Sequence, residues 1–417
     1  MEREEVLRLR DRLAAGARRP ARTVMEASTG SRGFVPGPRC ERAATGSGVL
    51  DGMRLAVKDL IDVAAAHTGG GNPDWLASHG VADADAPAVA LLRANGARVV
   101  GKTITDELAF SLEGDNAWYG APRHPTDPER LTGGSSSGSA AAVAWNEADI
   151  ALGTDTGGSV RVPASFCGVF AMRATHGRIS LDGVVPFAPS YDTVGWFARD
   201  AQRLRAAGRV LLQSRVTQTQ RPLKLRIAHD TLELADAPVR DALIDWCARA
   251  GIEQRVDVFD GDWHEWVNTY ATLQGLEIRQ QLGPWIRARK PAFGPSIAPR
   301  FEQALALDPA LFEIWNAWRT RARHSLATRL APGEAWLIPA APCVALQRNA
   351  SGDELGLFYQ RALALGSIAG HAGLPQITMP LASANSLPVA VSFIAAAGQD
   401  EQLLDLAVAL THNRSNA

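Results

Sequence analysis

The sequence has little of what would attach a protein to a membrane, export it or draw it to nucleic acid. Its 417 residues contain no stretch near the roughly 18 uninterrupted apolar residues that a transmembrane helix needs. Residues 1–20 are typical of a charged helix and lack the apolar segment of a signal peptide. A formal net charge of −1 gives no reason to expect nucleic acid or an anionic membrane surface as a partner.

Cysteine is also scarce, and the four that occur are far apart. None belongs to a Cys-x-x-Cys pair, which fits a reduced protein. Cys167 is interpreted as a small packed apolar residue. With 46% hydrophobic residues, the chain can bury a large core. The sequence therefore predicts a globular protein of the cytoplasm.

Two clusters of glycine and hydroxyl residues stand out, at 133–139 and 153–159. The first runs into the alanine-rich stretch 140–144, so its serines should lie at a helix N-terminus. Free backbone N–H groups collect there and favour negative charge. The second cluster follows residues 150–152, which are typical of a buried strand that stops as the cluster begins.

Glycines in the second cluster let the backbone approach a ligand closely. Consecutive N–H groups in such a turn can hold an oxyanion, with Ser159 presented beside them. Flexible Gly/Ser loops are the alternative interpretation, and the hydrophobic elements that enclose both clusters disfavour it. The two clusters are typical of a site for serine chemistry.

At these positions the chain resembles the amidase signature family of serine hydrolases. The resemblance runs from about residue 48 to about residue 200 and returns near residues 373–376. A pattern this long and ordered is highly specific. The motifs that carry it are Ala56-Val57-Lys58-Asp59, Gly133-Gly134-Ser135-Ser136-Ser137-Gly138-Ser139 and Gly153-Thr154-Asp155-Thr156-Gly157-Gly158-Ser159-Val160-Arg161-Val162-Pro163-Ala164.

The resemblance implies a catalytic Ser-cis-Ser-Lys triad. Ser159 is the expected nucleophile, Ser135 the bridging serine on a cis peptide bond, and Lys58 the base that takes the proton. Neither a metal nor a cofactor is expected. The residues that would support the site are Ser136, Asp155 and Arg161, and those whose N–H groups would form the oxyanion hole are Thr156, Gly157, Gly158 and Ser159.

These residue types suit the chemistry of such a triad. A serine hydroxyl is a poor nucleophile unless a neighbouring group accepts its proton. A lysine can accept it only when neutral, so its pKa must fall from about 10.4 through burial. Lys58 follows the apolar residues 55–57, which predicts a buried position at a strand end. The carboxylates of Asp106 and Glu107 are interpreted as structural, and nothing in the sequence places His176 against the nucleophile.

The predicted fold class is α/β, a single-domain α/β/α sandwich around a large mixed β-sheet. Residues 1–47 would form an N-terminal helix and lead-in, and residues 48–417 the amidase domain. Within that domain we expect a signature core at about 48–215, a variable helical cover at about 225–330 and a C-terminal return to the core at about 335–417. The later elements predicted are helix-rich blocks at 238–250, 263–289 and 300–330, helices at 358–372 and 401–410, and strands at 337–340 and 389–394.

The activity implied is hydrolysis of a carboxamide to a carboxylic acid and ammonia through an acyl-enzyme. The expected partners are a small-molecule amide and water, and a homodimer stays open. Residues 69–75, 139–144 and 192–200 most resemble indole-3-acetamide hydrolase-like amidases, which suggests a primary amide of an arylacetic or other small hydrophobic acid. Esters and cyclic amides stay open as substrates.

Three other interpretations stay open. An amidotransferase-type subunit would need partner subunits, and a non-catalytic amidase-like interaction module would have lost the triad residues, which are all present here. The run Gly134-Ser135-Ser136-Ser137-Gly138 also matches the nucleophile elbow of an α/β-hydrolase. That motif needs a preceding hydrophobic strand, whereas residues 125–132 are polar and broken by proline.

Overall fold

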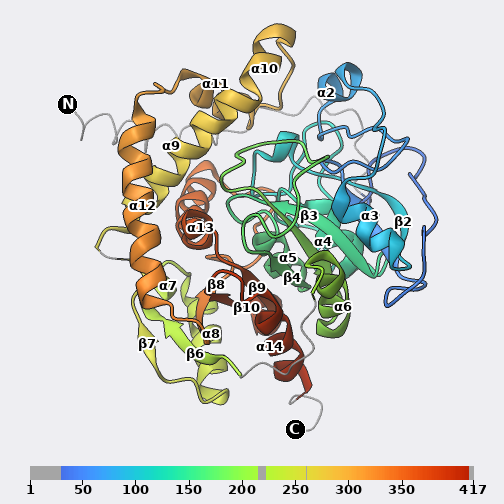
Figure 1. Ribbon diagram of the computed structural model, residues 1–417. Coiled ribbons are helices and arrows are strands. Elements are labelled where there is room, and N and C mark those ends of the chain that lie inside the picture. The colour runs from blue at the N-terminus through green and yellow to red at the C-terminus, as the bar shows by residue number, and fades with distance from the viewer. Residues whose placement is uncertain (1–29, 215–221, 260, 413–417) are drawn as a thin grey trace.

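A ten-stranded mixed β-sheet crosses the molecule, and helices cover both of its faces (Figure 1). The computed structural model describes residues 30–214, 222–259 and 261–412. The predicted α/β class with a large mixed sheet is confirmed. The helix predicted within residues 1–20 lies outside the described residues.

The sheet has a parallel group of three strands at each edge and antiparallel strands between them. In sheet order the strands are β2 (Arg98–Thr103), β1 (Arg54–Lys58), β3 (Ile150–Asp155), β5 (Thr193–Ala198), β4 (Phe170–Arg173), β9 (Gln376–Ala384), β10 (Leu387–Ala395), β8 (Glu334–Pro339), β6 (Lys224–Ala228) and β7 (Arg255–Val256). The central strands are buried along almost their whole length, as expected for a sheet that is covered on both sides.

One face of the sheet packs its larger apolar side chains against four helices. Leu55 and Val57 of β1 point to this face, because alternate side chains of a strand lie on opposite sides. The helices are α3 (Pro87–Ala94), α6 (Ala201–Leu211), α8 (Ala237–Arg249) and α14 (Asp400–His412).

The opposite face carries small residues where the first glycine cluster lies. Ala56 and Ala151 pack there against α4 (Ser137–Ala144) and α5 (Arg161–Cys167). Short side chains on both the helix and the sheet let α4 approach the strands closely. This packing brings the N-terminus of α4 to the ends of β1 and β3.

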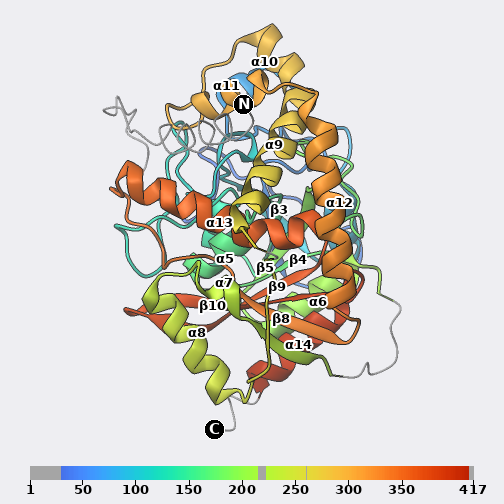
Figure 2. The same ribbon diagram turned by 90° about the vertical axis from the view of Figure 1, so that its left-hand side faces the viewer.

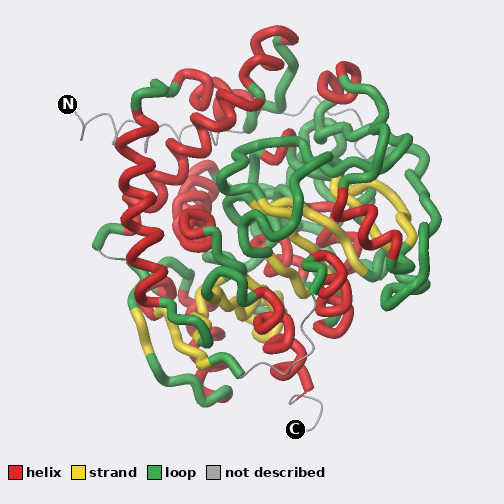
Figure 3. Tube along the Cα trace, viewed as in Figure 1, coloured by secondary structure: helices red, strands yellow, loops and turns green. Residues whose placement is uncertain are grey.

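A further group of helices covers the other half of the same face. Helices α9 (Trp263–Gln281) and α12 (Leu311–Arg329) pack against α13 (Gly352–Ala372) (Figure 2). Long helices dominate this half of the molecule, whereas loops are abundant in the half that holds α3 (Figure 3). The remaining helices are α2 (Pro73–Ser78), the 3-10 helix η1 (Glu107–Ala109), α7 (His229–Leu232), α10 (Gly283–Arg289) and α11 (Ala298–Ala306).

The later helices and strands predicted from the sequence are confirmed, with shifted ends, and the helix-rich blocks 263–289 and 300–330 each contain two helices, α9 with α10 and α11 with α12. Two other expectations are wrong in detail. The strand predicted to stop as the second cluster begins continues through Gly153, where a Cβ would lie only 2.7 Å from the Ser136 Oγ. The segment predicted as a helical cover also contributes β6 and β7 to the sheet. Within the described ranges, no helix is both long and apolar enough to cross a membrane.

Candidate active site

Two of the three motifs that contain predicted catalytic residues meet at the carboxyl ends of neighbouring strands. β1 and β3 are parallel neighbours, with Val57 opposite Leu152. Their carboxyl ends therefore lie side by side, which is where open α/β sheets bind ligands. Lys58 ends β1, and the turn that leads to Ser159 follows the end of β3.

Lys58 is fully buried and contacts two hydroxyl groups. Its Nζ donates hydrogen bonds to Ser135 Oγ and Thr154 Oγ1, both at 2.8 Å. Burial lowers the pKa of Lys58 to about 7, although the nearby carboxylates of Asp106 and Asp155 oppose the shift. A large fraction of this amine is neutral near pH 7, so it can accept a proton from Ser135.

Ser135 is fully buried and follows a cis peptide bond to Gly134, as predicted. Glycine is required before it, because a Cβ at Gly134 would lie 2.1 Å from Asp106 Oδ2. The backbone N–H of Asp106 also donates to the Ser135 carbonyl oxygen at 3.2 Å. Asp106 therefore supports the backbone of the serine that contacts Lys58.

Ser136 joins the two glycine clusters. Its Oγ donates to the Thr154 carbonyl oxygen at 3.2 Å, and its backbone N–H donates to the Ser159 carbonyl oxygen, also at 3.2 Å. These bonds hold the turn at Ser159 against the N-terminus of α4. A supporting role for Ser136 in the reaction stays a prediction.

Ser159 is 4% exposed and borders a pocket. Among the described residues, no hydrogen bond joins its Oγ to Ser135 Oγ. The contact between Lys58 and Ser135 is therefore formed, whereas a contact between Ser135 and Ser159 is not. Gly158 also differs from its expected part in an oxyanion hole, since its N–H donates to Asp155 Oδ1 at 3.1 Å. The N–H groups of Gly157 and Ser159 have no partner within the described ranges.

Asp155 is the centre of a buried ionic cluster behind this turn. It accepts hydrogen bonds from Arg161 Nη2 at 2.6 Å and from Arg173 Nη1 at 2.8 Å. Burial alone would raise the pKa of Asp155, but the two guanidinium groups outweigh it and hold the pKa well below its usual range. The same carboxylate accepts the N–H groups of Gly158 and Val160, so it fixes the turn before Ser159.

The other reactive side chains considered from the sequence do not approach the nucleophile. His176 Nε2 lies 2.8 Å from the Pro189 carbonyl oxygen and does not border the pocket. Cys167 is buried, and burial raises the pKa of its thiol. Glu107 accepts hydrogen bonds from Asn72 and Trp118, which supports a structural role. Within the described part of the chain, no group of three or more His, Cys, Asp or Glu side chains could hold a metal ion.

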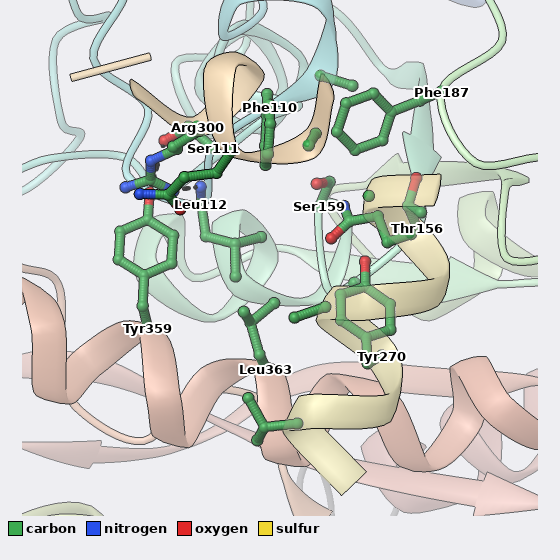
Figure 4. A pocket seen from close by; sticks show the side chains of 18 of the residues that line it. Phe110, Ser111, Leu112, Thr156, Ser159, Phe187, Tyr270, Arg300, Tyr359 and Leu363 are labelled. Carbon is green, nitrogen blue, oxygen red and sulfur yellow. Dashed lines mark hydrogen bonds between the residues drawn. The ribbon is translucent and has the colours of Figure 1, made fainter. Parts of the chain in front are cut away.

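The pocket in front of Ser159 is mainly apolar (Figure 4). Its charged side chain, Arg300, lies 3.3 Å from Glu113 and stacks on the ring of Tyr359 at 3.9 Å, so its charge is compensated. Most of the remaining exposed wall is formed by aromatic and aliphatic groups. The hydrophobic wall residues labelled in the figure are Phe110, Leu112, Phe187, Tyr270, Tyr359 and Leu363.

The sequence did not identify these wall residues. Tyr270, Arg300 and Tyr359 belong to α9, α11 and α13, more than a hundred positions from Ser159. The one sequence feature that could have pointed to them is the aromatic content of the later helices. Aromatic residues line pockets and fill hydrophobic cores alike, so this feature does not distinguish the two.

The chain is similar in sequence to one protein family and to curated proteins, and similar in structure to a solved amidase. The Amidase family matches residues 39–240. Amidase 1 of Arabidopsis thaliana is 38% identical over 393 residues, which cover 86% of this chain and 92% of that protein. Outer envelope protein 64, chloroplastic, of the same plant is 35% identical over 85% of this chain and 65% of its own length. A solved structure of an amidase matches with a TM-score of 0.80 and 27% identity, covering 98% of this chain and 99% of that one.

Proposed function

Since the chain belongs to the amidase family, we propose that it hydrolyses carboxamides through a serine acyl-enzyme. The observation that carries the proposal is the buried Lys58 amine, which lies 2.8 Å from Ser135 Oγ at the end of β1, next to the strand that leads to Ser159 and its pocket. An amine with a pKa of about 7 can act as a base at neutral pH, whereas an ordinary lysine cannot.

In the proposed reaction, the proton of Ser159 passes through Ser135 to neutral Lys58. The Ser159 oxygen then attacks the carboxamide carbon, and N–H groups such as that of Gly157 stabilise the oxyanion. Lys58 returns the proton through Ser135 to the leaving nitrogen, so that ammonia departs and an acyl-enzyme remains. Water attacks this ester by the same proton route, and the carboxylic acid is released.

The proposed substrates are primary amides of arylacetic or other small hydrophobic acids. The rings of Phe110, Phe187 and Tyr359 border the pocket, and the charge of Arg300 is compensated by Glu113. Such a pocket favours a flat apolar acyl group, whose burial contributes about 25 cal/mol per Å². It disfavours an acyl group that carries an unpaired charge.

Ammonia release from a panel of primary amides tests this proposal. The purified protein should act on indole-3-acetamide and phenylacetamide faster than on short aliphatic amides, because the larger groups bury more apolar surface. Ser159→Ala should release ammonia only at the background rate, and the exposed Ser180→Ala should match the wild type. If the wild type released no ammonia from any of the amides, the proposal would be contradicted and a subunit that needs partners would be favoured.

The activity should depend on the protonation of Lys58. Because the neutral amine is the base, kcat/KM should fall as the pH drops below about 7, the pKa of Lys58, and level off above it. A pH series from 5 to 9, with folding checked by circular dichroism, measures this. An acid limb that is absent between pH 5 and 8 would contradict the assignment of Lys58.

A second buried group titrates in the same range. Burial raises the pKa of Asp106 to about 6. Asp106→Asn removes this titration and keeps the shape of the side chain. Because the Asp106 carboxylate raises the pKa of Lys58, an acid limb that belongs to Lys58 should persist in Asp106→Asn and move to a lower pH. A limb that vanishes would belong to Asp106.

A further inference from the structure

Tyr270 carries a hydroxyl group that the described protein leaves without a partner. The residue lies on α9 and is 1% exposed, and its Oη makes no hydrogen bond to any described group. A buried polar group without a partner costs about 1–3 kcal/mol, and such groups are rare in native proteins. An isolated hydroxyl of this kind therefore points to a partner that comes from outside the protein.

The hydroxyl lies next to the turn that precedes Ser159. Tyr270 borders the same pocket as Ser159, and its hydroxyl end points toward Thr156 and Ser159 (Figure 4). A Cβ placed on Gly157 would be 2.3 Å from Tyr270 Oη. By standard backbone dimensions, Oη then lies within about 5 Å of the Gly157 nitrogen.

Two donors at that separation can share one acceptor. A hydrogen-bonded oxygen lies about 3 Å from each donor atom, so a single oxygen can accept from both the Tyr270 hydroxyl and the Gly157 N–H. The Gly157 N–H has no partner among the described residues, so both donors are available. A carbonyl oxygen of a substrate bound at Ser159 is an acceptor of the required kind.

The phenol is also held in its protonated form. Burial raises the pKa of Tyr270 well above its ordinary value, and the nearby Tyr191, Asp155 and Asp192 raise it further. The group therefore acts as a hydrogen-bond donor across the range in which the enzyme works. A neutral donor suits an oxygen that gains negative charge during acyl transfer.

We propose that the Tyr270 hydroxyl donates a hydrogen bond to the carboxamide oxygen of the substrate, beside the Gly157 N–H. The inference rests on the proposed amidase function and adds a side-chain donor to the backbone donors of the turn. Because solvent does not reach Oη, substrate binding must include a side-chain rotation in the pocket.

Tyr270→Phe tests the proposal, because it removes the hydroxyl oxygen and keeps the ring. We expect kcat/KM to fall by about 100-fold, the loss typical of a missing oxyanion donor, with the fall mainly in kcat. The melting temperature should stay unchanged or rise, because no hydrogen bond within the protein is lost. Equal kcat/KM in Tyr270→Phe and the wild type would overturn the proposal.

Two further measurements identify the substrate atom that the Tyr270 hydroxyl binds and distinguish a failure of this inference from a failure of the proposed amidase function. If the hydroxyl binds the carbonyl oxygen, Tyr270→Phe slows the amide and the ester of the same acid alike, whereas slowing of the amide alone would overturn the assignment to oxygen. Labelling of Ser159 by a fluorophosphonate, followed by intact mass, needs no known substrate and should slow to a similar extent. If the wild type is labelled but cleaves no amide, the proposed function fails while the donor is still tested.

Tyr191→Phe is the matched control. The Tyr191 ring lies 5.0 Å from that of Tyr270, but its hydroxyl is hydrogen-bonded to His371 Nδ1 at 3.2 Å and the residue does not border the pocket. This variant should lower the melting temperature and leave kcat/KM within a few-fold of the wild type. The opposite responses of the two tyrosines distinguish a substrate donor from a structural hydroxyl.

Discussion

Replacing Lys58 by methionine is expected to abolish amide hydrolysis while the protein stays folded. Methionine fills a similar volume but cannot accept the proton that Ser135 passes on. Removal of one member of a catalytic unit lowers kcat by about 10⁴-fold or more. Ammonia release measured over hours, with circular dichroism to check the fold, gives this result directly.

Lys58→Met should also change how the free energy of unfolding depends on pH. The pKa of Lys58 is about 7 in the folded protein and 10.5 in an ordinary environment, so the unfolded chain binds more protons between these values. The free energy of unfolding therefore gains a contribution from Lys58 as the pH rises above 7. Lys58→Met should lack this gain in urea titrations at pH 7 and pH 9.

Lys102→Met is the control for the loss of a buried lysine, because Lys102 lies on the strand next to that of Lys58. Lys102 is on β2, opposite Val57 of β1. It forms an ion pair with Asp59 at 3.4 Å and does not contact Ser135. Its loss should lower stability and spare most of the activity. If Lys58→Met retained wild-type turnover, or if both lysine variants lost activity equally, the proposed base would be wrong.

Replacing Asp155 by asparagine is expected to destabilise the protein by about 3–5 kcal/mol, because it leaves Arg161 and Arg173 buried without a counterion. Both arginine side chains are almost fully inaccessible to solvent, so water cannot replace the carboxylate. The midpoint of urea unfolding measures the loss. Activity should fall as well, since Asp155 holds the turn that presents Ser159.

An exposed ion pair provides the control for Asp155. Asp236 contacts Arg361 at 2.8 Å, with about half of its side chain exposed. Asp236→Asn should change the free energy of unfolding by less than about 1 kcal/mol, because solvent screens such pairs. An equal, small effect of both substitutions would show that the buried cluster contributes little to stability.

Much of the local structure could be predicted from the sequence. The alanine-rich stretch of α4 and the apolar residues of β1 and β3 are local signals, so these elements were found at nearly the right positions. The end of β3 was misplaced, because Gly153 normally weakens a strand. There it makes room for Ser136, a side chain from another segment, and local propensity contains no information about that contact.

The motifs alone were sufficient to indicate the family and to single out Lys58, Ser135 and Ser159, because each motif is a short, continuous run with strict backbone requirements. The tertiary structure alone decided how deeply Lys58 is buried and which side chains form the pocket. Tyr270 and Tyr359 come from distant helices that meet in front of Ser159 only after folding. Burial, pKa and pocket shape depend on contacts between remote segments, and the spacing of residues along the chain does not specify those contacts.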